Sequence, residues 1–199
     1  EKLYLKGQSQ VIWEHIVADL ETPVSALIKL TEGKKYNFLL ESVEGGNTRG
    51  RYSVIGIEPD LIWRCKNGVA EIANNFIKTP IFVEESDPPL VSLNKVINNS
   101  KIDLPAILPP PSAGLFGYIG YDMVQYFEKI NIKNDDTLSL PETILMRPSI
   151  VCIFDRLKDE FILITPIRYI ESLSAKEARI IANKRIKDAI NALNIGLPH

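Results

Sequence analysis

Apolar residues recur at helical spacing in three stretches of the chain, which begin after Thr22, after Pro89 and after Ser174. This spacing predicts three amphipathic helices, because residues three or four positions apart share one face of a helix. The first stretch starts with a capping hydroxyl and a proline, and it ends at Gly33. The third starts with a capping box, in which Ser174 and Glu177 bind each other's backbone N–H groups.

Shorter runs rich in aliphatic and aromatic residues predict β-strands. These runs cover residues 36–42, 51–57, 61–65, 69–73, 149–154 and 161–165. Asn67 and Gly68 separate two of the runs and are the pair favoured where a hairpin turn needs positive φ at both central positions. Residues 44–47 and 155–160 are the other two predicted turns. Because the strands follow one another as hairpins, we predict an α+β fold, a mostly antiparallel β-sheet with a few packed helices.

Two further segments have distinctive composition. Residues 102–112 hold four prolines, which predict an extended, non-helical connector that is either a spacer or a domain boundary. Gly114, Gly117 and Gly120 alternate with aromatic and aliphatic residues. Glycines inside a strand indicate either close approach of another backbone or ring, or direct contact with a ligand. We predict one domain over residues 1–199 and leave both interpretations of the glycines open.

Composition narrows the class of protein. The chain has 199 residues, 45% of them hydrophobic, and 23 Lys plus Arg against 25 Asp plus Glu, a formal net charge of −2. This balance is typical of an ordinary soluble globular domain and argues against a nucleic-acid partner. No apolar run approaches the ~20 residues that a membrane helix needs. We therefore expect a cytoplasmic protein that has no membrane partner.

The commonest catalytic motifs are absent from the sequence. It contains no phosphate-binding P-loop and no G-x-S-x-G elbow, and neither histidine has a Cys or His neighbour at the spacing of a zinc site. Cys65 and Cys152 each lie in an apolar, strand-like run and are predicted to be buried thiols and not a disulfide. The residues alone therefore predict no catalytic group and no metal site.

One cluster of side chains suits a zwitterionic ligand. Glu41 and Ser42 end one predicted strand and face Arg51, Tyr52 and Ser53 across a glycine-containing turn. A carboxylate such as Glu41 can hold an ammonium group, whereas Ser42, Arg51 or backbone N–H groups can hold a carboxylate.

Successive side chains of a strand point to opposite faces, so either Glu41 or Ser42 is expected to act through its backbone. The alternative is that Glu41, Arg49 and Arg51 are solvated turn charges, which pair for at most ~1 kcal/mol.

Five short strings occur in an order that resembles the N-terminal region of anthranilate synthase component I, a chorismate-utilising enzyme family. The strings are ADLETPVS (18–25), LLES (39–42), RGRYSVIG (49–56), DLIWRC (60–65) and AGLFGYIGYD (113–122). The resemblance covers roughly residues 11–166. The form RGRYS is more similar to anthranilate synthase than to its relative aminodeoxychorismate synthase.

The resemblance implies that the parent enzyme converts chorismate and ammonia to anthranilate and pyruvate with Mg²⁺. A glutamine amidotransferase subunit supplies the ammonia in this family. The chorismate and magnesium residues lie in the family's C-terminal half, so we expect an inactive N-terminal fragment with no cofactor of its own. Residues 167–199 are then a linker and helix that lead to the C-terminal catalytic domain.

The family's tryptophan feedback site includes the LLES segment. The resemblance therefore implies that Leu40, Glu41 and Ser42 contact tryptophan, with Arg51, Tyr52 and Ser53 as neighbours. Expected partners are tryptophan, the C-terminal chorismate-binding domain and the amidotransferase subunit. Two alternatives remain: the N-terminal part of an aminodeoxychorismate synthase of the folate pathway, or a docking module for the amidotransferase.

Overall fold

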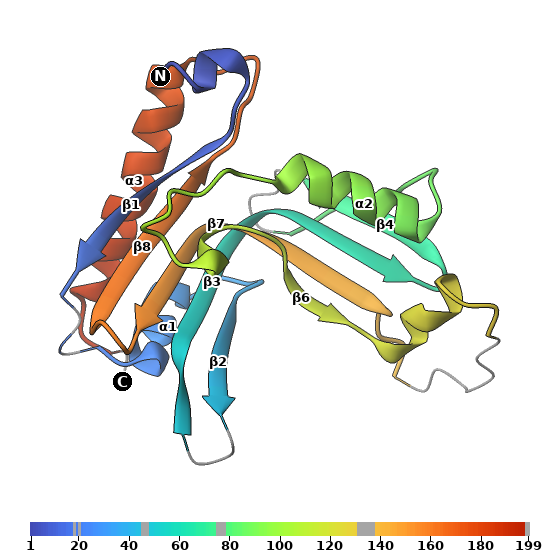
Figure 1. The fold of residues 1–199 in the computed structure, drawn as a ribbon, viewed down its shortest axis with the longest axis horizontal. Coiled ribbons are helices and arrows are strands. Elements are labelled where there is room, and N and C mark those ends of the chain that lie inside the picture. Colours follow the sequence, from blue (N-terminus) through green and yellow to red (C-terminus); the bar gives the residue numbers. More distant parts are fainter. Residues whose placement is uncertain (18, 20, 45–47, 75–78, 131–137, 198–199) are drawn as a thin grey trace. The chain divides into compact units, whose positions relative to one another are not determined.

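The computed structural model describes residues 1–17, 19, 21–44, 48–74, 79–130 and 138–197. These residues form an antiparallel sheet with helices packed on it, so the predicted α+β class is confirmed (Figure 1). Hydrogen-bonded strands follow the order β1-β8-β7-β3-β4-β5, with β2 on β3 and β6 on β7. The predicted turn at 44–47 falls largely on residues 45–47, which lie outside the described part of the chain.

The strands are β1 (Gln10–Ile16), β2 (Phe38–Glu44), β3 (Thr48–Lys66), β4 (Val69–Asn74), β5 (Val83–Glu84), β6 (Phe116–Ile119), β7 (Thr143–Asp155) and β8 (Glu160–Ile167). The helices are α1 (Pro23–Thr31), α2 (Pro89–Ser100) and α3 (Ala175–Leu193), and single 3-10 segments are η1 (Tyr4–Lys6), η2 (Pro110–Ser112) and η3 (Tyr121–Tyr126).

The chain divides into two compact units. Unit 1 comprises residues 1–59, 102–113 and 148–199, and unit 2 comprises residues 60–101 and 114–147. The long strands β3 and β7 each contribute to both units. The proline connector belongs to unit 1 and is not wholly extended. Its end forms η2, because proline φ angles suit a 3-10 turn, and Ser112 N–H donates to the Pro109 carbonyl at 3.1 Å.

All three predicted helices form, and two begin with the caps that the sequence indicates. Thr22 and Ser25 exchange side-chain-to-backbone hydrogen bonds at the start of α1. Ser174 and Glu177 do the same at the start of α3. Each cap satisfies N–H groups that the first turn of a helix leaves without partners.

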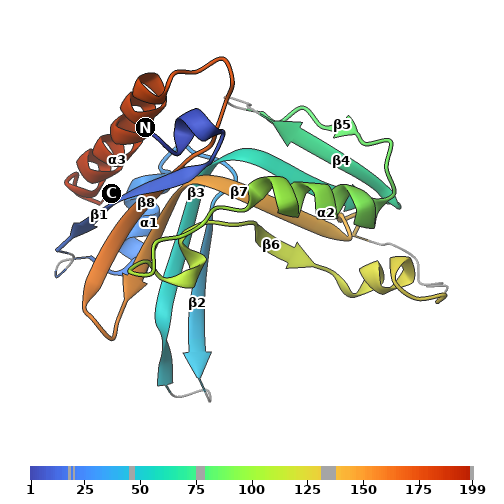
Figure 2. The ribbon, with the colours of Figure 1, turned by 45° about the horizontal axis from the view of Figure 1, so that its top comes forward.

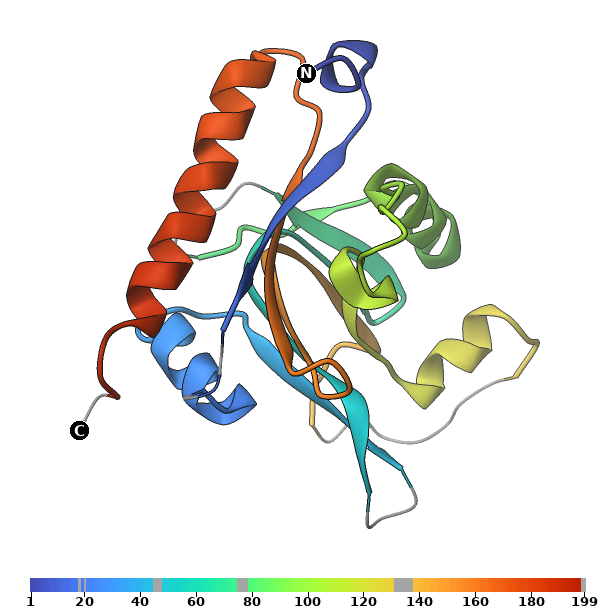
Figure 3. The same ribbon diagram turned by 60° about the vertical axis from the view of Figure 1, so that its left-hand side comes forward.

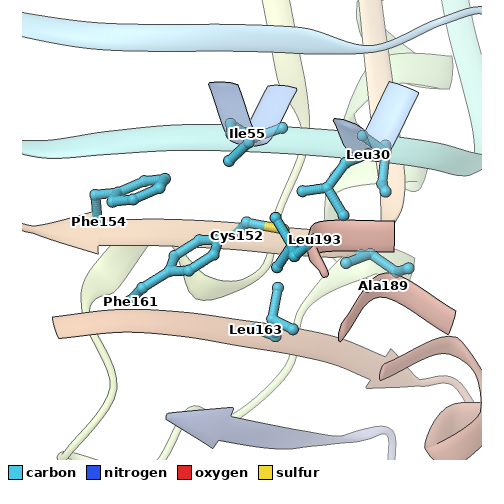
Figure 4. Packing of buried hydrophobic residues seen from close by; sticks show 11 residues of the cluster. Leu30, Ile55, Cys152, Phe154, Phe161, Leu163, Ala189 and Leu193 are labelled. Atoms are coloured by element: carbon cyan, nitrogen blue, oxygen red, sulfur yellow. The ribbon is translucent and has the colours of Figure 1, made fainter. Parts of the chain in front are cut away.

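The core of unit 1 lies between its sheet and the helices α1 and α3 (Figure 4). Phe154 and Phe161 stack with ring centroids 4.1 Å apart. Figure 3 shows α3 beside β1 and β8. The buried residues of α3 are Ala178, Ala182, Ile186, Ala189 and Leu193. Lys29 of α1 donates to the Leu193 carbonyl at 2.9 Å. Most of the apolar face of α3 is thus buried within the chain, whereas Ile180 and Ile181 of the same helix are 56% and 42% exposed.

In unit 2, α2 packs on the sheet (Figure 2). The fully buried Trp63 belongs to a core cluster that includes Leu93 and Val96 of α2. Its indole N–H donates to Ser92 Oγ of α2 at 2.9 Å, which gives the buried ring a polar partner. Asn67 and Gly68 have φ of 51° and 76°, so the predicted β3–β4 turn is confirmed. Cys65 and Cys152 are both buried and free, as predicted.

Candidate functional site

The β2–β3 hairpin of unit 1 carries all six predicted site residues. Glu41 pairs with Ser53, and Val43 pairs with Arg49, so the single residue Ser42 of β2 faces three residues of β3, numbers 50–52. This irregularity is a β-bulge, a device that bends a strand and redirects its side chains. The prediction that Glu41 and Ser42 point to opposite faces assumes an unbroken ladder of paired residues. The bulge interrupts the ladder directly after Glu41, so that assumption does not hold here.

Gly50 makes the bulge possible. A Cβ at this position would lie 2.1 Å from Ser42 Oγ and 2.4 Å from Ser42 Cβ, far inside contact distance. The side chain of Ser42 therefore occupies the space above Gly50. Both Glu41 and Ser42 are nevertheless exposed, and Leu40 beside them is 48% exposed. Two exposed polar side chains, Glu41 and Ser42, therefore follow an exposed apolar one, Leu40, along β2.

Glu41 is held through one of its two carboxylate oxygens. Its Oε1 accepts a hydrogen bond from Ser53 Oγ at 3.3 Å and from Arg156 Nη2 at 2.9 Å. Ser53 is fully buried, so it acts from beneath the surface. The other oxygen, Oε2, has no hydrogen-bond partner among the described residues.

Arg51 forms a bidentate ion pair with Asp155 at the end of β7. The Nε–Oδ1 distance is 2.9 Å and the Nη2–Oδ2 distance is 2.7 Å. The Asp155 side chain is 1% exposed, whereas that of Arg51 is 42% exposed. The hydrogen bond from Arg51 lowers the pKa of Asp155 and raises the pKa of Arg51. The Arg51 guanidinium also lies 4.8 Å from the centre of the Tyr52 ring.

Arg156 joins the site and was not singled out in the sequence. It lies in the turn between β7 and β8, where its Nη1 donates to the Gly50 carbonyl at 3.1 Å and its backbone N–H donates to the Arg51 carbonyl at 3.0 Å. The sequence signal is only the charged turn at 155–160. Nothing in the local pattern indicates that this turn binds a hairpin more than 100 residues earlier.

A cavity of about 460 Å³ lies beside the same turn. It is lined by Asp19, Glu21, Thr22, Pro23, Phe154, Asp155, Arg156, Asp159 and Glu160. Most of its polar groups are carboxylates, and Arg156 supplies the positive charge. Asp155 and Arg156 of this turn therefore contribute both to the hairpin site and to the lining of the polar cavity.

The glycine-rich segment in unit 2 has a packing role at two of its three positions. A Cβ on Gly117 would lie 1.9 Å from the Ile144 carbonyl oxygen, and one on Gly120 would lie 2.7 Å from the Glu142 carbonyl oxygen. Gly114 has open space around it. Close backbone approach, one of the two interpretations of this segment, is therefore confirmed for Gly117 and Gly120.

In the described part of the chain, the His, Cys, Asp and Glu side chains form no group of three or more that could hold a metal ion. None of the helices that the structure describes has the length and apolar character needed to cross a membrane.

Comparison with known proteins identifies relatives of the whole chain. It is 42% identical over 199 residues to anthranilate synthase component 1 of Cereibacter sphaeroides, covering 100% of this chain and 40% of the relative. It is 36% identical over 172 residues to the component 1 of Thermus thermophilus, covering 86% of this chain and 35% of that protein. No protein-family model matches the chain.

A solved structure has the same fold. The crystal structure of anthranilate synthase component I from Streptococcus pneumoniae matches with a TM-score of 0.57 and 23% identity, over 93% of this chain and 38% of that one. The chain thus spans about 40% of the length of the relatives that it matches. It belongs to the anthranilate synthase component 1 family and is homologous to the N-terminal ~40% of its members.

Proposed function

We propose that this chain is the N-terminal part of an enzyme that converts chorismate and glutamine-derived ammonia to anthranilate and pyruvate. The identity of 42% over all 199 residues to an anthranilate synthase component 1 supports this reaction. A glutamine amidotransferase subunit supplies the ammonia, and the enzyme works in the cytoplasm. Chorismate and Mg²⁺ bind to the part of the protein that this chain does not span, so the chain alone is inactive.

Within that enzyme, the β2–β3 hairpin contributes to a feedback site for tryptophan. The observation that carries this proposal is Oε2 of Glu41, which has no hydrogen-bond partner among the described residues and lies on a carboxylate already fixed through Oε1. A fixed carboxylate oxygen is a good acceptor for a ligand ammonium group. Ser42 offers a hydroxyl, and exposed Leu40 offers an apolar surface for an indole ring.

The contacts of the three β3 residues support different roles for them. Arg51 is engaged by Asp155 through two hydrogen bonds, so Ser42 and backbone N–H groups are the better candidates for the ligand carboxylate. Tyr52 lies against Arg51, and Ser53 supports Glu41. In this proposal Leu40, Glu41 and Ser42 touch tryptophan, whereas Arg51, Tyr52 and Ser53 shape the hairpin.

Inhibition then works through conformational equilibrium. Tryptophan stabilises one arrangement of this chain and the chorismate-binding domain, and a ligand shifts such an equilibrium only by its difference in affinity for the two states. This mechanism lets a part without catalytic residues control a separate active site.

The test uses the full-length protein and anthranilate formation. Ser42→Tyr fills the space above Gly50 and is expected to raise the half-inhibitory tryptophan concentration at least about tenfold, and Ser42→Ala to raise it less, because a hydrogen bond contributes about 1 kcal/mol. Ser172→Ala, an exposed serine elsewhere in unit 1, is the matched control. Unchanged inhibition in both Ser42 variants would contradict the site.

Two simpler measurements address the alternatives. Analysis of the reaction product separates anthranilate from aminodeoxychorismate. Co-elution of the full-length protein with the amidotransferase subunit tests the docking role. If Ser42→Tyr loses inhibition but still co-elutes, the hairpin is regulatory and does not serve to dock the amidotransferase.

A further inference from the structure

Arg156 has three hydrogen bonds to the β2–β3 hairpin, although it lies in a different hairpin. One goes from Nη2 to Glu41 Oε1, one from Nη1 to the Gly50 carbonyl, and one from the backbone N–H to the Arg51 carbonyl. The first ends on the candidate ligand-binding carboxylate, and the other two end on the backbone of the bulge. A single residue therefore fixes both the bulge and the side chain that projects beside it.

The contacts of Glu41 are asymmetric. Arg156 and Ser53 both bind Oε1, at 2.9 and 3.3 Å, and Oε2 has no partner among the described residues. A carboxylate anchored through one oxygen has a defined direction for the other. The Glu41 side chain is 41% exposed, so without Arg156 only the longer hydrogen bond from Ser53 would restrain its rotation.

Arg156 is itself held by a buried group. Its neighbour Asp155 is 1% exposed and binds both Arg51 and the backbone N–H of Leu157, at 3.1 Å for the latter. These bonds fix the turn on both sides of Arg156. Only 26% of the Arg156 side chain is exposed, which suits a supporting position better than a solvated charge.

We propose that Arg156 is a positioning residue that orients Glu41 so that Oε2 receives the ammonium group of an amino-acid ligand. This inference rests on the proposed tryptophan site and adds a residue from β7–β8 to it. Arg156 acts through Glu41, so its loss weakens ligands that carry an ammonium group. Ligands of the same shape that lack this group do not depend on Glu41 and keep their affinity.

The experiment compares tryptophan with indole-3-propionate, which has the same ring and carboxylate but no amine. Binding of both to the full-length protein is measured by calorimetry, together with inhibition and with kcat and KM without ligand. The variants are Arg156→Gln and Arg156→Lys. The matched control is Lys158→Gln, which changes a cation in the same turn whose ion-pair partner is Glu160 and not Glu41.

For Arg156→Gln we expect tryptophan binding to weaken about tenfold, because a charge-assisted hydrogen bond is lost, while indole-3-propionate changes less than about twofold. Arg156→Lys keeps one charged donor and is expected to restore part of the affinity. Lys158→Gln should match wild type for both ligands. If Arg156→Gln folds poorly, Arg156→Lys is compared with wild type in the same way. The difference between the loss of tryptophan affinity and the loss of indole-3-propionate affinity is then expected to be smaller.

Each outcome has a distinct meaning. Equal weakening of both ligands would overturn the positioning role, because it would mean general damage or direct contact of Arg156 with the carboxylate. Unchanged tryptophan binding in Arg156→Gln, with inhibition lost in Ser42→Tyr, would overturn this inference and leave the proposed site intact. A wild-type protein that tryptophan neither binds nor inhibits would overturn both.

Discussion

Gly50 in unit 1 and Gly117 in unit 2 both lie inside strands, but different atoms exclude a side chain at each. A Cβ added to Gly50 would meet the Ser42 side chain first, at 2.1 Å from Oγ and 2.4 Å from Cβ. A Cβ added to Gly117 would meet the Ile144 carbonyl oxygen first, at 1.9 Å. Rotation of Ser42 about its Cα–Cβ bond moves only Oγ, so its Cβ at 2.4 Å and its backbone carbonyl carbon at 2.9 Å would still meet the added Cβ. Gly50 therefore faces both a side chain and backbone, whereas Gly117 faces backbone alone.

The difference separates a structural glycine from one at a candidate site. In unit 2, β6 can pair with β7 only if position 117 has no side chain, so Gly117 determines the strand pairing. In unit 1, Gly50 makes room for Ser42, an exposed polar residue of the candidate site. The same residue type therefore allows a strand pairing in β6 and the placement of a candidate ligand residue in the β2–β3 hairpin.

The largest effect is expected for Gly117→Ala. The added methyl group meets the backbone of β7 and has no flexible neighbour to displace, so the free energy of unfolding should fall by about 3 kcal/mol or more. Urea unfolding of the protein measures this loss. Gly196→Ala, at a position with open space, is the control and should change stability by less than about 0.5 kcal/mol. A loss below about 1 kcal/mol for Gly117→Ala would show that β6 shifts away from β7 at little cost, against this expectation.

A smaller loss is expected for Asp155→Asn, which weakens the polar anchor of the hairpin. The variant keeps the shape of the side chain but removes the negative charge of the carboxylate whose oxygens accept both Arg51 hydrogen bonds. The free energy of unfolding should therefore fall by about 2 kcal/mol. Asp159→Asn, an exposed carboxylate in the same turn, is the matched control. Equal effects of the two variants would mean that the buried pair contributes no more than a solvated charge.

The Arg51–Asp155 ion pair should make the stability of the β2–β3 hairpin depend on pH, whereas the stability of β6 should not. The pKa of Asp155 is lower in the folded protein than its usual value of 3.8, so the unfolded chain takes up the proton first as pH falls. The ion pair therefore contributes its full stabilisation at neutral pH. This contribution begins to be lost below about pH 4, where the unfolded chain takes up the proton, and it is gone once the pH falls below the lowered pKa of the folded protein. Amide hydrogen exchange should lose protection in β2–β3 before β6, and simultaneous loss would contradict the distinction.

A comparable loss is expected for Gly50→Ala in the hairpin. The methyl group would meet the Cβ and the backbone carbon of Ser42, which rotation of the serine does not move, so β2 has to shift and the free energy of unfolding should fall by about 2 kcal/mol. Combining it with Ser42→Gly removes the two side-chain contacts but not the backbone one, so the double variant should recover part of the loss in a double-mutant cycle. Additive losses would mean that the backbone of the bulge, and not the serine side chain, resists the methyl group.

Local sequence signals predicted much of this fold because their partners are close in the chain. The capping box at Ser174, the turn at Asn67 and Gly68, and the β7–β8 hairpin all depend on neighbours within a few residues. Strand continuity was harder to predict. The runs 51–57 and 61–65 form the single strand β3, because Pro59 is accommodated where Glu58 adopts a φ of 50°.

Strand β1 was missed for a related reason. Residues Gln10–Ile16 have a mixed burial pattern and no regular alternation of apolar and polar positions, so periodicity does not identify them. Their pairing with β8, more than 140 residues later, completes the edge of the sheet. Pairing over that separation depends on the whole fold and leaves no local pattern.

The sequence by itself determined the fold class, the helix caps, the hairpin turns and the set of candidate ligand residues from Leu40 to Ser53, since each depends on local chemistry or on short strings shared with a family. Only the tertiary structure decided how that chemistry is arranged. It brought Asp155 and Arg156 to the β2–β3 hairpin, tied Arg51 to a buried carboxylate and fixed Glu41 through one of its two carboxylate oxygens. The physical reason is that hydrogen bonds and ion pairs depend on distance in space, which strand pairing sets across more than 100 residues of chain.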